Sequence, residues 1–317
     1  MNKITIYLKS IAKKKVDKIL ENLIAKDKIV CVDVGAKGGV LQLNGLDTYC
    51  LYYGFEPNLE EYNKLKQTDS HHYFPYGLSE TGGKKQFYIT KHASYSSLLE
   101  CNFDSYRNHF GKVKGFLKWY QGMEVLKNTT IKTETLDSFA LNQDLNQIDF
   151  LKLDTQGTEL SLLKSGKQLL EAKKISVIFA EVTFIEVYKN QNLFSDLDKY
   201  LKAQGYEFID CRFYPDSVIT EPFSEAKYEK SRYSVGGDVI YVPRLETIAK
   251  NKLQCFKIGL ILSSMRYLSM SSVYLKQSGL LKNDIDNIHR YMYKINSKAL
   301  LKYFLPPILL NFINKIK

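Results

Sequence analysis

A short apolar run that ends at a cluster of glycines constrains the fold of this chain more than any other feature. Residues 29–34 read Ile-Val-Cys-Val-Asp-Val, and the glycine-rich stretch 35–39 follows at once. An apolar run of this length that is closed by glycine is typical of a buried parallel strand ending in a tight turn. Because glycine has no Cβ atom, the backbone N–H groups of such a turn can approach a ligand closely.

Apolar runs alternate with helix-like patterns along most of the chain. This alternation is typical of a parallel sheet whose strands are joined by helices. We therefore predict an α/β fold of the Rossmann-like, doubly wound type with a mostly parallel sheet. The expected strands lie at residues 29–34, 49–55, 73–76, 148–153, 175–180, 207–211 and 238–242, and the expected helices at 59–67, 158–170 and 193–204.

The same patterns predict three parts of the chain. Residues 1–28 form a helical segment, residues 29–245 form the α/β domain, and residues 246–317 form a helical extension. The segment from about 84 to 135 breaks the rhythm with a strand-like run at 86–90 and a stretch rich in Ser, Tyr, His and Lys. Insertions of this kind in α/β proteins usually build part of a substrate site.

Positive charge is concentrated in the C-terminal extension. Residues 244–317 contain thirteen Lys and Arg against three Asp and Glu, nearly all of the formal net charge of +11. Such a tail can attract phosphate, anionic lipid or nucleic acid, or it can be a solvated face. Residues 297–317 alternate lysines with Leu, Ile and Phe and could lie on an anionic membrane. Packing against the core or a homo-oligomer contact is favoured over that role.

The compartment can also be predicted. Residues 1–15 lack the apolar segment of a signal peptide, and no window reaches the roughly 18 apolar residues that span a bilayer. The five cysteines are scattered, with no spacing that indicates a zinc site or a disulfide framework. We expect buried thiols in a cytoplasmic protein, with peripheral contact at the inner face of the membrane left open.

Two acids stand beside the predicted turns. Asp33 precedes Gly35 by two residues, and the turn is not the dinucleotide pattern Gly-x-Gly-x-x-Gly, so it suits a cationic amino group or sulfonium better than a pyrophosphate. Glu56 ends the next strand about twenty residues later, where a carboxylate can accept hydrogen bonds from two ribose hydroxyls. A plain tight turn and a surface glutamate are the alternatives.

These residues resemble the FkbM family of S-adenosylmethionine-dependent methyltransferases, and the resemblance covers about residues 29–243. Its most specific part is the segment 149–166, which reads DFLKLDTQGTELSLLKSG: a strand ending in an acid, a glycine, and a second acid where a helix begins. The other matching stretches are residues 33–36, 54–58, 76–79, 135–139, 179–182, 205–206 and 237–241.

The resemblance implies S-adenosylmethionine as cofactor and O-methylation of sugar or polyketide hydroxyls as activity. It also implies that Asp33, Gly35 and Glu56 hold the cofactor. Gly77, Leu78 and Ser79 are expected near its adenine, and the predicted cofactor site further includes Ala36, Lys37, Gly39, Pro57 and Asp154.

The chain departs from the family pattern at two positions. Lys37 stands where the family commonly has Asn, which brings a cation near the sulfonium pocket unless the side chain points away. Gln156 stands where the family commonly has the first Glu of an Asp-x-Glu-Gly-x-Glu motif. The loss of that charge could weaken cofactor binding, alter the handling of the acceptor, or mark a less active protein.

Four residues are candidates for the catalytic groups. Asp154 and Glu181 follow two predicted parallel strands and could orient the acceptor or share a divalent cation. Alternatively, Asp154 bonds backbone N–H groups of the next helix and Glu181 faces solvent. His92 and His109 are candidate bases because imidazole titrates near neutral pH. No residue is assigned to a metal. Flat and polar side chains that could contact a sugar lie at residues 95–97, Tyr106, Trp119 and Tyr120.

The sequence leaves three functions open. The leading one is an O-methyltransferase acting on a hydroxyl of a saccharide or glycoconjugate. An RNA methyltransferase is favoured by the basic tail, but no RNA-binding module is recognisable, so nucleic acid is the weaker choice of partner. The third is a non-catalytic scaffold in which Lys37 and Gln156 have disabled the site.

Overall fold

The computed structural model describes residues 16–22, 24, 27–104, 121–213 and 235–295. The chain divides into two units. Residues 29–41 and 51–248 form one, which we call the α/β unit, and residues 1–28, 42–50 and 249–317 form the other, which we call the helical unit. The N-terminal and C-terminal segments therefore belong to one unit, which the sequence pattern did not predict.

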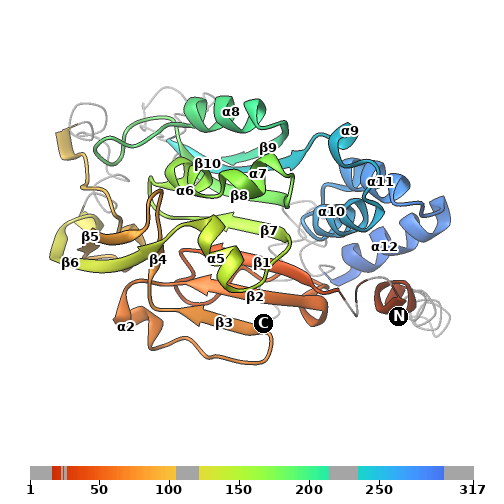
Figure 1. Cartoon of the computed structure of the whole chain (residues 1–317), viewed down its shortest axis with the longest axis horizontal. Helices are drawn as coiled ribbons and strands as arrows, with labels where there is room; N and C mark the ends of the chain where they lie inside the picture. The colour runs from red at the N-terminus through yellow and green to blue at the C-terminus, as the bar shows by residue number, and fades with distance from the viewer. Residues whose placement is uncertain (1–15, 23, 25–26, 105–120, 214–234, 296–317) are drawn as a thin grey trace, which may run out of the picture. The chain divides into compact units, whose positions relative to one another are not determined.

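A seven-stranded sheet in the order β3-β2-β1-β7-β8-β10-β9 is the centre of the α/β unit (Figure 1). The pairs β1–β7, β7–β8 and β2–β3 are parallel, whereas β10 is antiparallel to both β8 and β9. The prediction of a doubly wound, mostly parallel α/β fold is confirmed. The strands are β1 (Ile29–Val34), β2 (Cys50–Phe55), β3 (His71–Phe74), β7 (Ile148–Leu153), β8 (Ile175–Thr183), β9 (Tyr206–Phe213) and β10 (Gly236–Pro243).

Two of the predicted helices differ in the structure. The helix expected at 59–67 ends after α2 (Leu59–Tyr62), because Gln67 instead bonds the backbone N–H and C=O of Tyr73, each at 2.8 Å. The helix expected at 158–170 is divided at Gly166 into α6 (Glu159–Ser165) and α7 (Lys167–Glu171). The remaining helices of the unit are α5 (Leu136–Asn142), α8 (Phe194–Ala203) and α9 (Leu245–Ile248).

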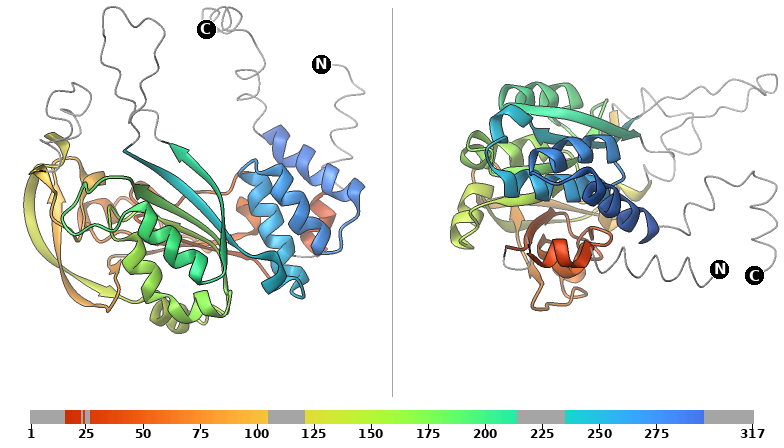
Figure 2. Two further views of the ribbon diagram at one scale, coloured as in Figure 1. Left: turned by 90° about the horizontal axis from the view of Figure 1, so that it is seen from above. Right: turned by 90° about the vertical axis from the view of Figure 1, so that its right-hand side faces the viewer.

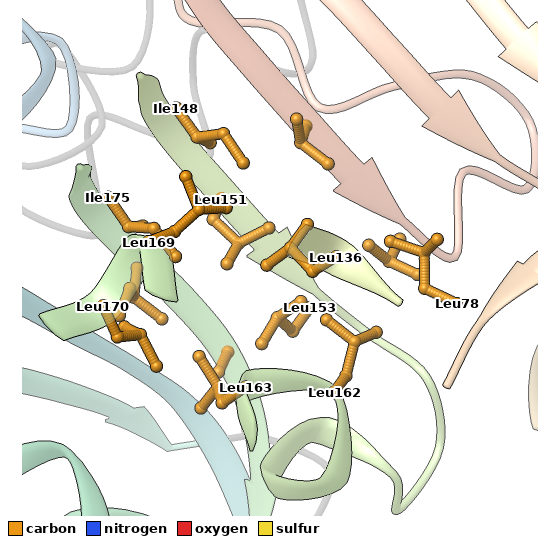
Figure 3. Packing of buried hydrophobic residues seen from close by; sticks show 14 of the residues in the cluster. Leu78, Leu136, Ile148, Leu151, Leu153, Leu162, Leu163, Leu169, Leu170 and Ile175 are labelled. Carbon is orange, nitrogen blue, oxygen red and sulfur yellow. The ribbon is translucent and has the colours of Figure 1, made fainter. Parts of the chain in front are cut away.

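The core of the α/β unit lies between the sheet and these helices. Leu151 and Leu153 of β7 pack in one cluster with Leu162 and Leu163 of α6, and all four side chains are fully buried (Figure 3). Burial of each such leucine stabilises the fold by about 1.5 to 3 kcal/mol. This packing fixes the loop between β7 and α6.

A second sheet of three strands was only partly predicted. Its order is β4-β6-β5, formed by β4 (Gly77–Leu78), β6 (Val125–Glu134) and β5 (Gly83–Thr90), and the 3₁₀ helix η2 (Ala93–Tyr95) follows β5. Strand β6 escaped prediction because it has no apolar run: of its ten residues only Ile131 and Thr133 are buried, and the others are mostly Lys, Asn and Thr.

The helical unit contains α10 (Lys252–Ser264), α11 (Leu268–Gln277) and α12 (Lys282–Ile295), which lie side by side (Figure 2). It also contains the 3₁₀ helix η1 (Asp47–Tyr49) and a helix at residues 16–22. Lys257 of α10 is buried and donates to Asp27 Oδ1 at 2.7 Å and to the carbonyl of Lys28 at 3.0 Å. This ion pair joins the N-terminal segment to the C-terminal helices.

The structure tests only part of the predictions about membrane contact and about the cysteines. Within the described ranges, no helix is both long and apolar enough to cross a membrane. Residues 297–317 lie outside the described residues, so membrane contact and oligomer contact through them stay predictions. The five cysteines all lie in the described ranges and form no disulfide there; four are buried and Cys211 is half-buried.

Candidate functional site

A cavity of about 380 Å³ opens at the carboxyl ends of β1, β2, β7 and β8 in the α/β unit. Doubly wound proteins bind their ligands at this edge of the sheet, in pockets of roughly 300 to 1,000 Å³. The second sheet and η2 complete the walls. The lining residues at the ends of the main strands and in the segments that follow them are Val34, Gly35, Lys37, Phe55, Glu56, Pro57, Lys152, Asp154, Thr155, Gln156, Thr158 and Glu181, and the others are Gly77, Leu78, Phe87, Ala93, Ser94, Tyr95, Ser96, Leu98 and Ile131.

The glycine turn after β1 depends on close packing of backbone against backbone. The N–H groups of Gly35 and Ala36 both donate to the carbonyl of Phe55, at 3.1 and 2.9 Å. Gly35 has a φ of +98°, and a Cβ atom built on it would lie 2.0 Å from the carbonyl oxygen of Asp154. Only glycine therefore allows the ends of β1 and β7 to meet here.

Glu56 places a buried carboxylate at the cavity. Its Oε1 accepts the backbone N–H of Asn58 at 2.8 Å, and Asn58 in turn caps α2. Burial raises the pKa of Glu56 to about 7, while the hydrogen bond from Asn58 and the charge of Lys37 oppose that rise. Near neutral pH the group is thus divided between its acid and carboxylate forms, and hydrogen-bond donors on a ligand would favour the carboxylate.

The side chain of Lys37 is directed at the η2 segment. Its Nζ donates to Ser94 Oγ at 3.0 Å, and both residues line the cavity. Lys37, which stands where the family commonly has Asn, therefore links the glycine turn to η2.

Asp33 and Lys152 form a buried ion pair at the wall of the cavity, where Lys152 belongs to the lining and Asp33 does not. They are neighbours in the parallel ladder of β1 and β7, and Lys152 Nζ lies 3.0 Å from Asp33 Oδ1 and 3.4 Å from Asp154 Oδ2. Burial alone would lower the pKa of Lys152, but the two carboxylates outweigh it and raise the pKa. Asp33 Oδ2 also accepts the N–H of Leu41 at 2.7 Å. Asp33 does not line the cavity, and its carboxylate is bound to these partners.

Lys152→Met is expected to lower the free energy of unfolding by about 3 to 5 kcal/mol at pH 7.5, because Asp33 would remain buried without its cation. Urea unfolding measures this loss. Lys64→Met removes an exposed pair with Glu61 and should change stability by less than about 1 kcal/mol. If adding Asp33→Asn to Lys152→Met recovers no stability, the ion pair is not the cause of the loss.

The loop after β7 brings Asp154, Gln156 and Glu181 together at the cavity. Gln156 Nε2 donates to Asp154 Oδ1 at 3.0 Å and also to Glu181 Oε2, while its Oε1 accepts the hydroxyl of Tyr188 at 2.9 Å. The side chain of Asp154 is 42% exposed, so it remains accessible from the cavity. The sequence left open that Asp154 bonds backbone N–H groups of the next helix and that Glu181 faces solvent. In the structure Glu181 lines the cavity, and the backbone N–H groups of the loop are bound by another residue.

Those loop amides are bound by Glu159, at the beginning of α6. Its carboxylate accepts the backbone N–H of Thr155 at 2.8 Å and that of Gly157 at 3.1 Å. The side chain is buried, and burial raises its pKa to about 7. Glu159 therefore fixes the shape of the loop that carries Asp154 and Gln156.

The other predicted site residues have different positions. Gly35, Lys37, Glu56, Pro57, Gly77, Leu78, Asp154 and Glu181 line the cavity, whereas Ala36, Gly39, Ser79 and His92 do not. The Ser79 hydroxyl is bound to Thr133 Oγ1 at 2.7 Å, and the His92 ring packs at a tilt against the ring of Tyr95, with centroids 4.8 Å apart. His109, Tyr106, Trp119 and Tyr120 lie outside the described residues.

Sequence reasoning missed several polar residues of this site, among them Lys152, Ser94 and Tyr188. Lys152 had a signal, since it is a lone lysine within an apolar strand. Ser94 was visible only as part of a polar stretch, and Tyr188 had no local signal at all, because it reaches Gln156 from 32 positions further along the chain.

The fold and the position of the cavity are those of doubly wound α/β proteins, which bind ligands outside the carboxyl ends of their strands. Residues 33–208, more than half of the chain, match the family described as the methyltransferase FkbM domain. The chain belongs to the FkbM methyltransferase family, and its cofactor is S-adenosylmethionine.

Comparison with other proteins adds little on the acceptor. No curated protein matches the chain. Among solved structures, magnesium protoporphyrin IX methyltransferase from Synechocystis PCC 6803 with bound SAM is similar at 12% identity and a TM-score of 0.32, covering 77% of this chain and 85% of that one. Likeness at this level does not carry that protein's acceptor over to this chain.

Proposed function

We propose that this methyltransferase is an O-methyltransferase acting on a hydroxyl of a saccharide or glycoconjugate. The observation that carries the proposal is the composition of the cavity wall: two carboxylates, Asp154 and Glu181, with the hydroxyl-bearing Ser94, Tyr95 and Ser96 of the η2 segment. Such a wall offers hydrogen-bond acceptors and donors to a polyhydroxylated molecule, together with a flat ring for its C–H surface.

The remaining lining residues fit the cofactor. Glu56 supplies a carboxylate for ribose hydroxyls, the turn at Gly35 supplies backbone that a ligand can approach, and Leu78, Phe87 and Ile131 supply apolar surface for a purine ring. When bound, S-adenosylmethionine would supply an activated methyl group for transfer to the acceptor oxygen, with the electron pair of the carbon–sulfur bond left on sulfur. The protein's own part is to orient the acceptor and exclude water.

The acceptor hydroxyl must also lose a proton. Asp154 and Glu181 are the lining carboxylates beside the loop after β7, and either can accept that proton, a contribution of roughly 10² to 10⁴ in rate. Lys152 Nζ lies 3.4 Å from Asp154 Oδ2 and so helps to hold that carboxylate in place. We assign the role of base to this pair of carboxylates in place of His92, which does not line the cavity.

The charges at the cavity favour a glycan over RNA. Among the described lining residues the cations are Lys37 and Lys152, bonded to Ser94 and to Asp33 with Asp154, whereas three carboxylates face the same space. A polyanion binds where unpaired Lys and Arg gather, because its affinity comes mainly from phosphate contacts.

The test is transfer of an isotopically labelled methyl group to a panel of glycans and to RNA, read by mass spectrometry. We expect methylated glycan with wild type and a rate at least 100-fold lower when Asp154→Asn and Glu181→Gln are combined, with S-adenosylhomocysteine still bound, because either carboxylate alone can accept the proton. Methylated RNA without methylated glycan would refute the acceptor class. Cofactor binding without transfer to any acceptor would favour the non-catalytic scaffold instead.

A further inference from the structure

The amide of Gln156 occupies the space between two carboxylates. Its single NH₂ group donates to Asp154 Oδ1 at 3.0 Å and to Glu181 Oε2, which uses both of its hydrogens. Carboxylates that are ionised only accept hydrogen bonds, so the amide nitrogen must face them and the amide oxygen must face away. The hydroxyl of Tyr188, a buried residue, lies 2.9 Å from that oxygen and 3.0 Å from the backbone carbonyl oxygen of Tyr95, so its one hydrogen is shared between two acceptors and supports the amide in this orientation.

The backbone at Gln156 is held in an unusual conformation. Its φ is +57°, in the left-handed region that non-glycine residues rarely adopt, and its carbonyl accepts the hydroxyl of Ser97 at 2.7 Å. Strained conformations persist where the surroundings enforce them, and they gather at functional sites. Ser97, Tyr188 and the two carboxylates together hold both ends of this residue.

Two carboxylates that share a site repel one another, and proteins usually relieve the repulsion with a shared proton or a cation. Lys152 Nζ lies 3.4 Å from Asp154 Oδ2, whereas the amide of Gln156 bridges the other oxygen, Oδ1, to Glu181 Oε2. We propose that the Gln156 amide takes the place of a proton or cation between these two oxygens, so that Gln156 is a positioning residue that holds Asp154 and Glu181 side by side as two carboxylates at the cavity. The inference rests on the proposed function, because the carboxylates it positions are those that would meet the acceptor hydroxyl.

The proposal makes a prediction about cation binding. In the part of the chain that the structure describes, no three His, Cys, Asp or Glu side chains are grouped as a metal site. Gln156→Glu would add a third carboxylate to Asp154 and Glu181, and carboxylate oxygens are the ligands that Mn²⁺ prefers. The loss of the amide donors and the added charge should together turn the pair into a cation site.

Calorimetry of the full chain with Mn²⁺ alone tests this. We expect Gln156→Glu to bind Mn²⁺ at least tenfold more tightly than wild type, and Glu181→Gln added to it to abolish the gain. Gln42→Glu, at an exposed position, is the matched control for an added carboxylate and should behave as wild type. Equal Mn²⁺ affinity of wild type and Gln156→Glu would overturn the proposal.

Two further measurements distinguish a failure of the proposed function from a failure of the proposed role of Gln156. S-adenosylhomocysteine binding by wild type in EDTA reports on the proposed function, and its absence would refute that function without affecting the Mn²⁺ comparison. If Gln156→Glu does not fold, Gln156→Ala carries the test, because it removes the bridge and adds no charge. We expect it to bind Mn²⁺ more tightly than wild type, and no difference from wild type would refute the role of the amide.

Discussion

Glu56→Ala is expected to weaken binding of S-adenosylhomocysteine by about 10-fold to 100-fold, since hydrogen bonds to a charged group contribute about 1.5 to 3 kcal/mol. The carboxylate is buried at the cavity, where water competes poorly for the ligand's hydroxyls. Isothermal titration calorimetry at pH 8 measures the loss. Glu61→Ala, at an acid of α2 outside the lining, should bind as wild type does.

The same group makes binding depend on pH. Because the pKa of Glu56 is about 7 and the ligand favours the carboxylate, affinity should fall up to tenfold per unit as pH drops below 7. Glu56→Gln should bind more weakly, with a flat profile over this range. The pKa of Glu56 in the folded protein is about 7, above the usual value of 4.5, so this group lowers the free energy of unfolding as pH rises from 4.5 through 7. Glu56→Gln should therefore not lower the Tm at pH 8. A wild-type affinity that does not change between pH 6 and pH 8 would contradict the assignment.

Gly35→Ala is expected to destabilise the protein by more than about 4 kcal/mol, or to prevent folding. The added Cβ would lie 2.0 Å from the carbonyl oxygen of Asp154, a backbone atom that cannot turn aside as a side chain can, and the φ of +98° adds strain. Thermal and urea unfolding measure the effect. Because the contact is with β7, cofactor binding should be lost together with stability.

Gly38→Ala is the matched control for this substitution. Gly38 also has a positive φ, of +77°, but no atom lies within 4 Å of the Cβ that would be added. Only the cost of placing a non-glycine residue at a positive φ remains, so the free energy of unfolding should fall by about 1 to 2 kcal/mol. Similar losses for the two variants would show that the approach of β1 to β7 at Gly35 is not the constraint.

The strands show where a sequence pattern suffices. β1 and β7 have the predicted bounds, since each is apolar almost throughout and is buried on both faces. β6 was missed because only one side of part of the strand is buried, so its residues alternate without forming an apolar run. The division between α6 and α7 at Gly166 was also missed, and there a Cβ atom would lie 2.7 Å from the side chain of Leu136 of α5, a contact that the sequence does not reveal.

The sequence likewise predicted some of the site residues and not the position of others. Gly35, Glu56, Asp154 and Glu181 were named from motifs at strand ends, and all four line the cavity, because the carboxyl ends of neighbouring parallel strands meet at one edge of a sheet. Asp33 was named from the same kind of motif, yet it is turned to Lys152 and does not line the cavity. No local pattern distinguishes the two outcomes.

The sequence by itself determined the α/β class, the glycine turn and the family, because these depend on residues close together in the chain. The tertiary structure alone decided which carboxylates face the cavity and which are paired. The pairing of Asp33 with Lys152 follows from the register of β1 against β7, and the bridge from Gln156 to Glu181 and Tyr188 joins separate segments. Such contacts depend on how distant segments pack, a property that the spacing of residues along the chain does not encode.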